Sequence, residues 1–90
     1  MYFVYVLKSK KDNKLYKGYT NNLAVRFEQH NKGNVPATKD RRPLVLIYYE
    51  ACVSKIDALK REKYFKTYYG QMFIKKRLKS YFTGFNPKSI

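Results

Sequence analysis

Acidic residues are scarce in this sequence. Six aspartates and glutamates stand against twenty lysines and arginines, a formal net charge of +14. This excess is larger than solubility requires and implies an anionic partner, for which nucleic acid is the usual candidate. An anionic membrane surface is the competing interpretation, but the basic residues are spread over predicted strands, loops and helices and not gathered on one amphipathic helix. A merely basic surface is the third alternative.

Cysteines and long apolar runs are also lacking. Cys52 is the single cysteine of the chain, which excludes an internal disulfide bond and a thiolate metal cluster and fits a reducing cytoplasm. No apolar run approaches the roughly 18 residues of a transmembrane helix, and the N-terminus shows no secretion signal. We therefore expect a cytoplasmic protein that is not a membrane protein.

What is present is the composition of one globular domain. The chain has 90 residues, of which 44% are hydrophobic and 18% aromatic, enough for a single domain with a modest core. We expect residues 1–82 to form this domain and residues 83–90 to be a loosely ordered tail.

The pattern of apolar and turn residues predicts an α+β fold with a small antiparallel sheet, in the order β-β-α-β-α-α. Residues 2–9 are apolar on both faces, as in a central strand, and residues 15–20 return as a hairpin after an Asp-Asn turn. Gly18 inside the second strand indicates that another backbone or a ligand approaches closely there.

Capping residues set the limits of the helices that we expect. The first predicted helix runs from Leu23 to about Asn31, with Asn21 or Asn22 as its cap and Gly33 as its stop. An irregular basic loop and a strand over residues 44–50 follow. The second predicted helix runs from about Lys55 to Tyr69, with a Ser54–Asp57 capping box and Gly70 as its end, and a third lies within residues 71–82.

One face of the first helix carries unusual residues. Leu23, Arg26, Phe27 and His30 follow the i, i+3, i+4, i+7 spacing of a single face. Two of the four are not apolar. Arg26 can stabilise phosphate charge, and His30 one turn later can orient water or accept a proton. Alternatively both lie at the edge of the apolar stripe, with Arg26 reaching into solvent.

The shortage of carboxylates narrows the search for a metal ligand. Asp12 and Asp57 have local structural roles, Asp40 lies in the basic loop, Glu28 falls on the outer face of its helix, and Glu50, at a strand end, stays open. Glu62 shares the inward spacing of Ala58 and Phe65 and is the best candidate for a hard oxygen ligand. The alternative for Glu62 is an ordinary helical ion pair with Lys66.

Ten tyrosines are too many to share one role. Tyr5 and Tyr16 differ from the others because they fall on the two strands of the predicted hairpin, beside Gly18. A phenol has a free pKa near 10 and can act as a base at neutral pH only among cations or beside metal-bound water.

Taken together, these residues resemble a known family. The ordered set Phe3-Val4-Tyr5, Tyr16-Lys17-Gly18, Arg26, His30 and Glu62 is similar to the motifs of the GIY-YIG endonuclease superfamily. Its small stand-alone branch, similar to the N-terminal nuclease domain of the UvrC-like excinucleases of bacteria, is the nearest match, and the resemblance runs from residue 2 to about residue 80. It implies a three-stranded antiparallel sheet flanked by helices.

The resemblance also implies roles for single residues. Glu62 would hold one Mg²⁺ or Mn²⁺ ion, Tyr16 would activate the attacking water, and Tyr5 would orient that water or share the role. Arg26 would steady the phosphate charge and His30 would sit at the edge of the site. The basic residues that we expect to contact nucleic acid are Lys17, Lys39, Arg41, Arg42 and Lys66.

Three residues depart from the family motifs. Phe3 stands where the first motif has glycine, Lys17 replaces the central isoleucine of the second, and Tyr19 stands where the excinuclease domain has lysine. Strand alternation places Lys17 opposite Tyr16.

Two functions from different classes follow. The first is a metal-dependent endonuclease acting on DNA, including branched or damaged DNA as in DNA repair, with a protein partner supplying specificity. The second is a nucleic-acid-binding domain with a degenerate nuclease site. A basic protein of a membrane surface or the ribosome is a weaker third, and the sequence does not set the oligomeric state.

Overall fold

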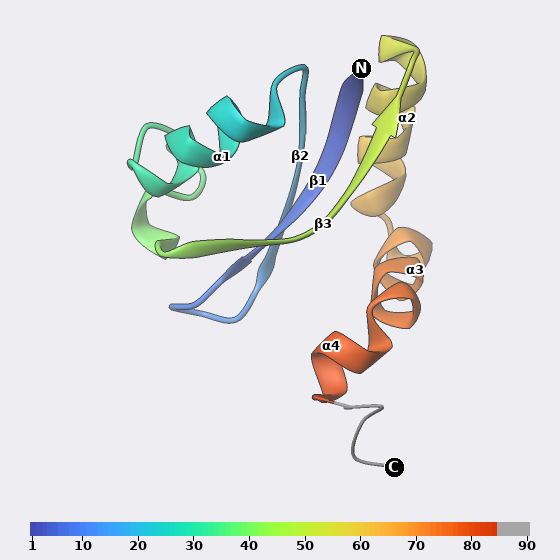
Figure 1. The fold of residues 1–90 in the computed structure, drawn as a ribbon. Coiled ribbons are helices and arrows are strands. Elements are labelled where there is room, and N and C mark those ends of the chain that lie inside the picture. The colour runs from blue at the N-terminus through green and yellow to red at the C-terminus, as the bar shows by residue number, and fades with distance from the viewer. Residues whose placement is uncertain (85–90) are drawn as a thin grey trace.

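The computed structural model describes residues 1–84 as a three-stranded antiparallel sheet with helices against both faces (Figure 1). The elements in chain order are β1 (Tyr2–Ser9), β2 (Leu15–Thr20), α1 (Leu23–Asn31), the 3-10 helix η1 (Lys39–Arg41), β3 (Leu44–Cys52), α2 (Lys55–Phe65), α3 (Tyr68–Arg77) and α4 (Lys79–Thr83). The strand order is β2-β1-β3. The predicted α+β class, the central first strand and the hairpin are therefore confirmed.

Strand β1 is central because both of its faces are apolar. Its even-numbered side chains Val4 and Val6 face α2 and α3 and pack in one buried cluster with Ala58, Phe65 and Ile74. Its odd-numbered side chains Tyr5 and Leu7 face α1 and form a second cluster with Leu44, to which Tyr16, Leu23, Phe27 and Leu46 add partly buried surface. The sheet thus separates two small cores, and the second one contains the tyrosines singled out from the sequence.

The limits of α1 agree with the prediction. The Asn22 side chain caps the helix by accepting a hydrogen bond from the Val25 N–H at 3.2 Å. Gly33 follows the helix with φ of +81°, a left-handed conformation that glycine adopts at helix ends. The loop after it, predicted to be irregular, contains η1 and buries Val35 and Thr38.

The predicted second helix is wrong at its C-terminal end. Helix α2 stops at Phe65, and Thr67 begins α3 by accepting a hydrogen bond from the Gly70 N–H at 3.1 Å. Gly70 lies inside α3, where an added Cβ would sit 2.6 Å from the Tyr64 carbonyl carbon and 2.7 Å from the Phe65 Cα. Gly70 therefore allows two helix backbones to come into close contact and does not end a helix.

The C-terminal part of the chain differs from the prediction in one further respect. The last predicted helix is divided at Leu78 into α3 and α4, and α4 ends at Thr83. The predicted tail otherwise falls on residues 85–90, which lie outside the described residues. Within residues 1–84, none of the helices combines the length and the apolarity needed to cross a bilayer.

Candidate active site

Tyr5, Tyr16 and His30 form one aromatic cluster between the sheet and α1. In the hairpin, Tyr5 pairs with Gly18 and Leu7 pairs with Tyr16, so both tyrosines project from the same face of the sheet. The ring centroids are 6.4 Å apart for the two tyrosines, 5.6 Å for Tyr5 and His30, and 5.1 Å for Tyr16 and His30. The hairpin and α1 thus bring together three of the predicted site residues.

A chain of buried hydrogen bonds fixes the middle of this cluster. The Tyr5 hydroxyl lies 2.8 Å from His30 Nε2, and His30 Nδ1 lies 2.7 Å from Thr38 Oγ1. Tyr5 is 1% exposed, and His30 and Thr38 are fully buried. The resemblance placed His30 at the edge of the site, whereas in the structure it is interior and holds Tyr5 in place.

Burial keeps both groups neutral. Burial, together with the smaller effect of the nearby positive charge of Arg26, lowers the pKa of His30 to about 4. Burial likewise raises the pKa of Tyr5. Arg26 opposes this effect by lowering the pKa, and the charges of Tyr16 and Glu62 raise it by smaller amounts. At neutral pH the imidazole therefore has one donor and one acceptor nitrogen, and the Tyr5 hydroxyl keeps its proton.

Thr38 is the member of this hydrogen-bonded chain of side chains that sequence reasoning missed. It lies eight residues after His30, in the loop where no periodicity marks a buried position. One nitrogen of the neutral imidazole donates and the other accepts, and the hydroxyls of Thr38 and Tyr5 can take the complementary roles. The Thr38 hydroxyl is thus part of the construction of the site.

Gly18 makes room for Tyr5. An added Cβ would lie 2.9 Å from Tyr5 Cε1 and would overlap Tyr5 Cζ and the hydroxyl oxygen. The close approach expected at this glycine is therefore made by the side chain of Tyr5, which lies across β2. A larger residue at this position would push the phenol away from His30.

Arg26 and Glu62 carry opposite charges, and both influence the pKa of Tyr5. Arg26 is half-buried on α1, where its Nη1 donates to Gln29 Oε1 at 3.2 Å. Glu62 is half-buried on α2, and both side chains act on the pKa of Tyr5. The predicted ion pair of Glu62 with Lys66 exists, but at 3.8 Å it is long. The Glu62 carboxylate therefore keeps most of its capacity for another cation.

Other carboxylates are engaged elsewhere. Three of them have close basic partners: Asp12 with Arg41 at 2.9 Å, Glu50 with Arg61 at 2.8 Å and Glu28 with Lys32 at 2.6 Å. Glu50, which the sequence left open as a ligand, also accepts a hydrogen bond from the Tyr48 hydroxyl at 2.9 Å. Among residues 1–84, no three His, Cys, Asp or Glu side chains gather as a metal cluster.

A magnesium-like ion remains compatible with this arrangement. Mg²⁺ in phosphoryl-transfer sites is commonly held by one or two carboxylates and completes its shell with water and substrate phosphate. Glu62, half-buried on α2, is a carboxylate that could meet that requirement.

Three of the five basic residues predicted to contact nucleic acid are engaged away from the tyrosines. Arg41 is bonded to Asp12, and Arg42 donates to the Lys39 carbonyl at 2.8 Å. Lys17 lies on the opposite face of β2 from Tyr16, as strand alternation predicted, in a groove that it shares with Lys75. Arg41 and Arg42 therefore have local structural partners.

Comparison with known proteins agrees with this geometry. Residues 1–79 match the family model described as the GIY-YIG catalytic domain. A UPF0213 protein of Staphylococcus haemolyticus is 45% identical over 75 residues, which cover 82% of this chain and 90% of that protein. A UPF0213 protein of Staphylococcus aureus strain Mu3 is 46% identical over 68 residues, 74% of this chain and 82% of that one.

A solved structure shows the same relationship. The solution NMR structure of a UPF0213 protein from Bacillus halodurans matches with a TM-score of 0.52 and 29% identity, covering 82% of each chain. These relatives are themselves little larger than the matched region, and their names state no activity. With a family match over residues 1–79 and the paired tyrosines, arginine, histidine and glutamate in the expected order, the chain belongs to the GIY-YIG catalytic-domain family.

Proposed function

We propose that this protein is a metal-dependent endonuclease that hydrolyses phosphodiester bonds in DNA, with branched or damaged DNA as its substrate. One observation carries the proposal: Tyr5, Tyr16 and His30 pack together in a single cluster between the sheet and α1, the helix that also carries Arg26. The family is a nuclease family, and the net charge of +14 suits a polyanionic substrate.

The two tyrosines have different roles in this proposal. Tyr5 is 1% exposed and bonded to His30, whereas Tyr16 is half-buried and keeps contact with solvent. Tyr16 is therefore the phenol that a substrate can reach, and it orients and activates the attacking water. Tyr5 is a positioning residue that, with His30, forms the rigid wall behind Tyr16.

Arg26 and Glu62 supply the charge. Arg26 donates forked hydrogen bonds to the non-bridging phosphate oxygens, whose negative charge grows as the bond forms. Glu62 holds the divalent cation, Mg²⁺ or Mn²⁺. When bound, this cation supplies positive charge to the phosphate and to the leaving oxygen.

A second candidate function is nucleic-acid binding without cleavage. Lys17 faces away from Tyr16, and Tyr19 packs on the same side as Lys17, in the cluster with Val4 and Val6. The face of β2 that carries Tyr16 therefore presents no lysine to a phosphate. In this case a partner protein would supply the chemistry.

The decisive experiment is a cleavage assay on labelled single-stranded, duplex, nicked, flapped and four-way DNA with Mg²⁺, Mn²⁺ or EDTA. We expect metal-dependent nicking that falls at least about 100-fold in Tyr16→Phe and Glu62→Gln, the size typical of a lost acid–base or charge-stabilising group. Glu28→Gln is the matched control, because Glu28 is an exposed carboxylate whose partner is Lys32.

Two outcomes would contradict the proposal. Full activity in Glu62→Gln would show that the ligand is assigned to the wrong residue. Salt-sensitive binding without nicking, equal in all variants, would favour the non-catalytic function.

A further inference from the structure

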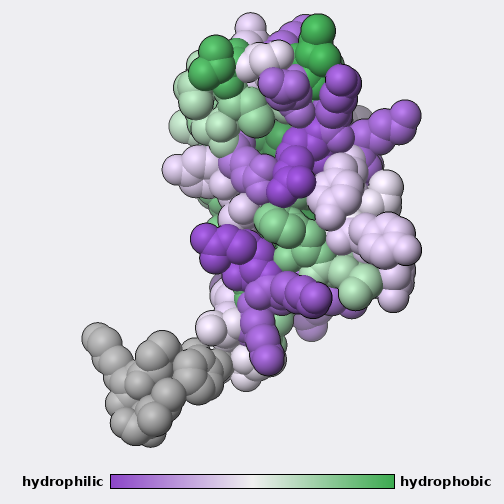
Figure 2. Space-filling view, turned by 90° about the vertical axis from the view of Figure 1, so that its right-hand side faces the viewer, coloured by the Kyte–Doolittle hydropathy of each residue, from purple (hydrophilic) through white to green (hydrophobic). Residues whose placement is uncertain are grey.

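A groove lies on the face of the sheet away from Tyr5. It has a volume of about 650 Å³ and is bounded by β2 with the preceding turn on one side and by α3 and α4 on the other. Figure 2 views the side formed by α2, α3 and α4 and shows hydrophilic side chains interrupted by apolar ones. Through Leu15 the groove borders the core that contains Val4 and Val6, and of its lining residues Lys17 alone was predicted from the sequence to contact nucleic acid.

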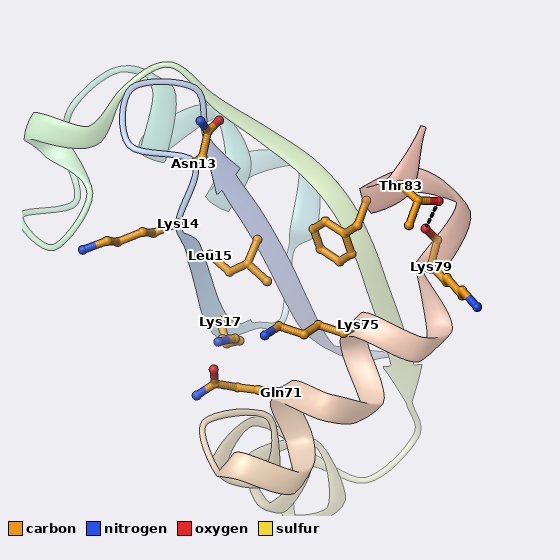
Figure 3. Close-up of a pocket in the computed structure, with 9 residues that line it drawn as sticks. Asn13, Lys14, Leu15, Lys17, Gln71, Lys75, Lys79 and Thr83 are labelled. Atoms are coloured by element: carbon orange, nitrogen blue, oxygen red, sulfur yellow. Dashed lines mark hydrogen bonds between the residues drawn. The ribbon is translucent and has the colours of Figure 1, made fainter. Parts of the chain in front are cut away.

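Positive charge converges in this groove. Figure 3 shows the side chain of Lys75, from α3, extending toward Lys17, from β2, with Gln71 beside them. Lys14 and Lys79 line the two ends with their ammonium groups turned outward. Within the part of the chain that the structure describes, no acidic residue contributes to the lining.

Lys17 is held there at an electrostatic cost. Burial lowers the pKa of its ammonium group, and repulsion by Arg41, Lys66 and Lys75 lowers it further. A half-buried lysine facing other cations weakens the folded state unless an anion relieves the repulsion. A bound phosphodiester group would relieve it and contact both Lys17 and Lys75.

The uncharged part of the lining narrows the choice of anion. Leu15 and the ring of Phe82 form an apolar floor, and Asn13 and Gln71 add amide groups. Duplex DNA keeps its base faces stacked inside, so it would use the lysines and leave this floor uncovered. An unpaired strand presents both phosphates and base faces, and a cationic track beside an aromatic surface is how proteins bind such strands.

We propose that this groove binds an unpaired nucleic-acid strand, as a second binding site across the sheet from the candidate active site. The inference rests on the nucleic-acid part of the proposed function and is independent of cleavage. Lys66 connects the two sites, because it pairs with Glu62 and its charge also acts on Lys17. Since β2 is an edge strand, a strand leaving the site can pass around it into the groove.

The test is fluorescence anisotropy with labelled oligo(dT) and with a blunt hairpin duplex, in EDTA over a range of salt concentrations. Lys17→Gln/Lys75→Gln is compared with Lys55→Gln/Lys60→Gln, which removes the same charge from exposed positions of α2 outside the groove. We expect the groove variant to bind oligo(dT) about tenfold more weakly and its salt slope to fall by about 1.4, since each single-strand phosphate contact contributes roughly 0.7. The control pair should lose less than half as much.

Two companion measurements separate folding and chemistry from binding. The groove variant should unfold at the same temperature as the wild type or higher, because the substitution removes repulsion. Phe82→Ala should weaken oligo(dT) binding about fivefold or more through the lost base stack and leave duplex binding unchanged.

Three results would overturn the inference. Equal losses in the groove and control pairs would mean diffuse electrostatic binding. If Lys17→Gln/Lys75→Gln and Phe82→Ala each weakened the binding of oligo(dT) and of the duplex by the same factor, the unpaired strand would be excluded as the occupant. Displacement of oligo(dT) by polyglutamate at the same charge concentration would show a site for any polyanion. In each case nicking by the wild type would still support the proposed nuclease.

Discussion

Replacing Gly18 by alanine tests whether this glycine builds the site. A glycine-to-alanine change within a strand normally stabilises a protein by about 0.5–1 kcal/mol, because alanine loses less backbone freedom on folding. At Gly18 the new Cβ would overlap Tyr5 Cζ and the hydroxyl oxygen and lie 2.9 Å from Cε1. Carbon atoms in contact prefer separations of about 3.5–4.0 Å. The ring must therefore retreat by roughly 1 Å.

Tyr5 has no free direction in which to retreat. It is 1% exposed, and its hydroxyl lies 2.8 Å from His30 Nε2. Overpacking costs about 1–3 kcal/mol, and a buried hydrogen-bonding group left without its partner costs about 1–3 kcal/mol more. After the backbone gain is subtracted, we expect Gly18→Ala to lower the free energy of unfolding by about 3 kcal/mol. For a domain of this size that is a fall of about 12–24 °C in midpoint temperature.

Thermal and urea unfolding measure this effect, and a double-mutant cycle identifies its cause. In a Tyr5→Leu background the atoms that the new Cβ would meet are gone, so Gly18→Ala should cost less than about 1 kcal/mol. A coupling energy of about 2 kcal/mol or more is expected, within the range found for residues in contact. The reasoning would be refuted by an equal cost in both backgrounds, or by a Gly18→Ala protein as stable as the wild type.

Three other predictions concern groups buried beside these. Gly70→Ala should cost about 3 kcal/mol or more, measured by urea unfolding, because its Cβ would meet the backbone of Tyr64, which cannot turn aside. Thr38→Val should cost about 1–3 kcal/mol, because it leaves His30 Nδ1 without its partner. The ¹⁵N shift of Nδ1 should change, and Thr38→Ser should restore both the stability and the shift. The free energy of unfolding should fall by about 3 kcal/mol as the pH drops from 6.5 to about 4, because His30 binds a proton in the unfolded chain over this range but not in the folded protein. In His30→Gln the midpoint temperature of unfolding should depend less on pH over the same range.

The local parts of the site could be predicted from the sequence. Asn22 and Gly33 mark the limits of α1, and the spacing of Arg26 and His30 shows that both belong to the face turned toward the sheet. Interactions within one helix or one hairpin depend on residues close in the chain, so their pattern is visible without a structure.

Contacts made through a loop or a helix crossing could not be predicted. Thr38 reaches His30 only because the chain after Gly33 folds back beneath α1, and no residue pattern specifies that path. Gly70 is ambiguous for a different reason: a missing Cβ suits a helix end as well as a close approach of two helices. Only the position of the Tyr64 carbonyl distinguishes the two.

The two proposed sites depend on the register of a single short strand. Alternation places Tyr16 and Gly18 of β2 on the face with His30, and Lys17 on the face with the groove. A slip of one residue would exchange these faces and destroy both sites together. The turn before β2 prevents such a slip, because Asn13 adopts φ of +60° and Asp12 accepts hydrogen bonds from the Lys14 N–H at 2.8 Å and from Arg41 at 2.9 Å. Arg41, first considered as a nucleic-acid contact, thus supports both sites by fixing the turn that sets the register of β2.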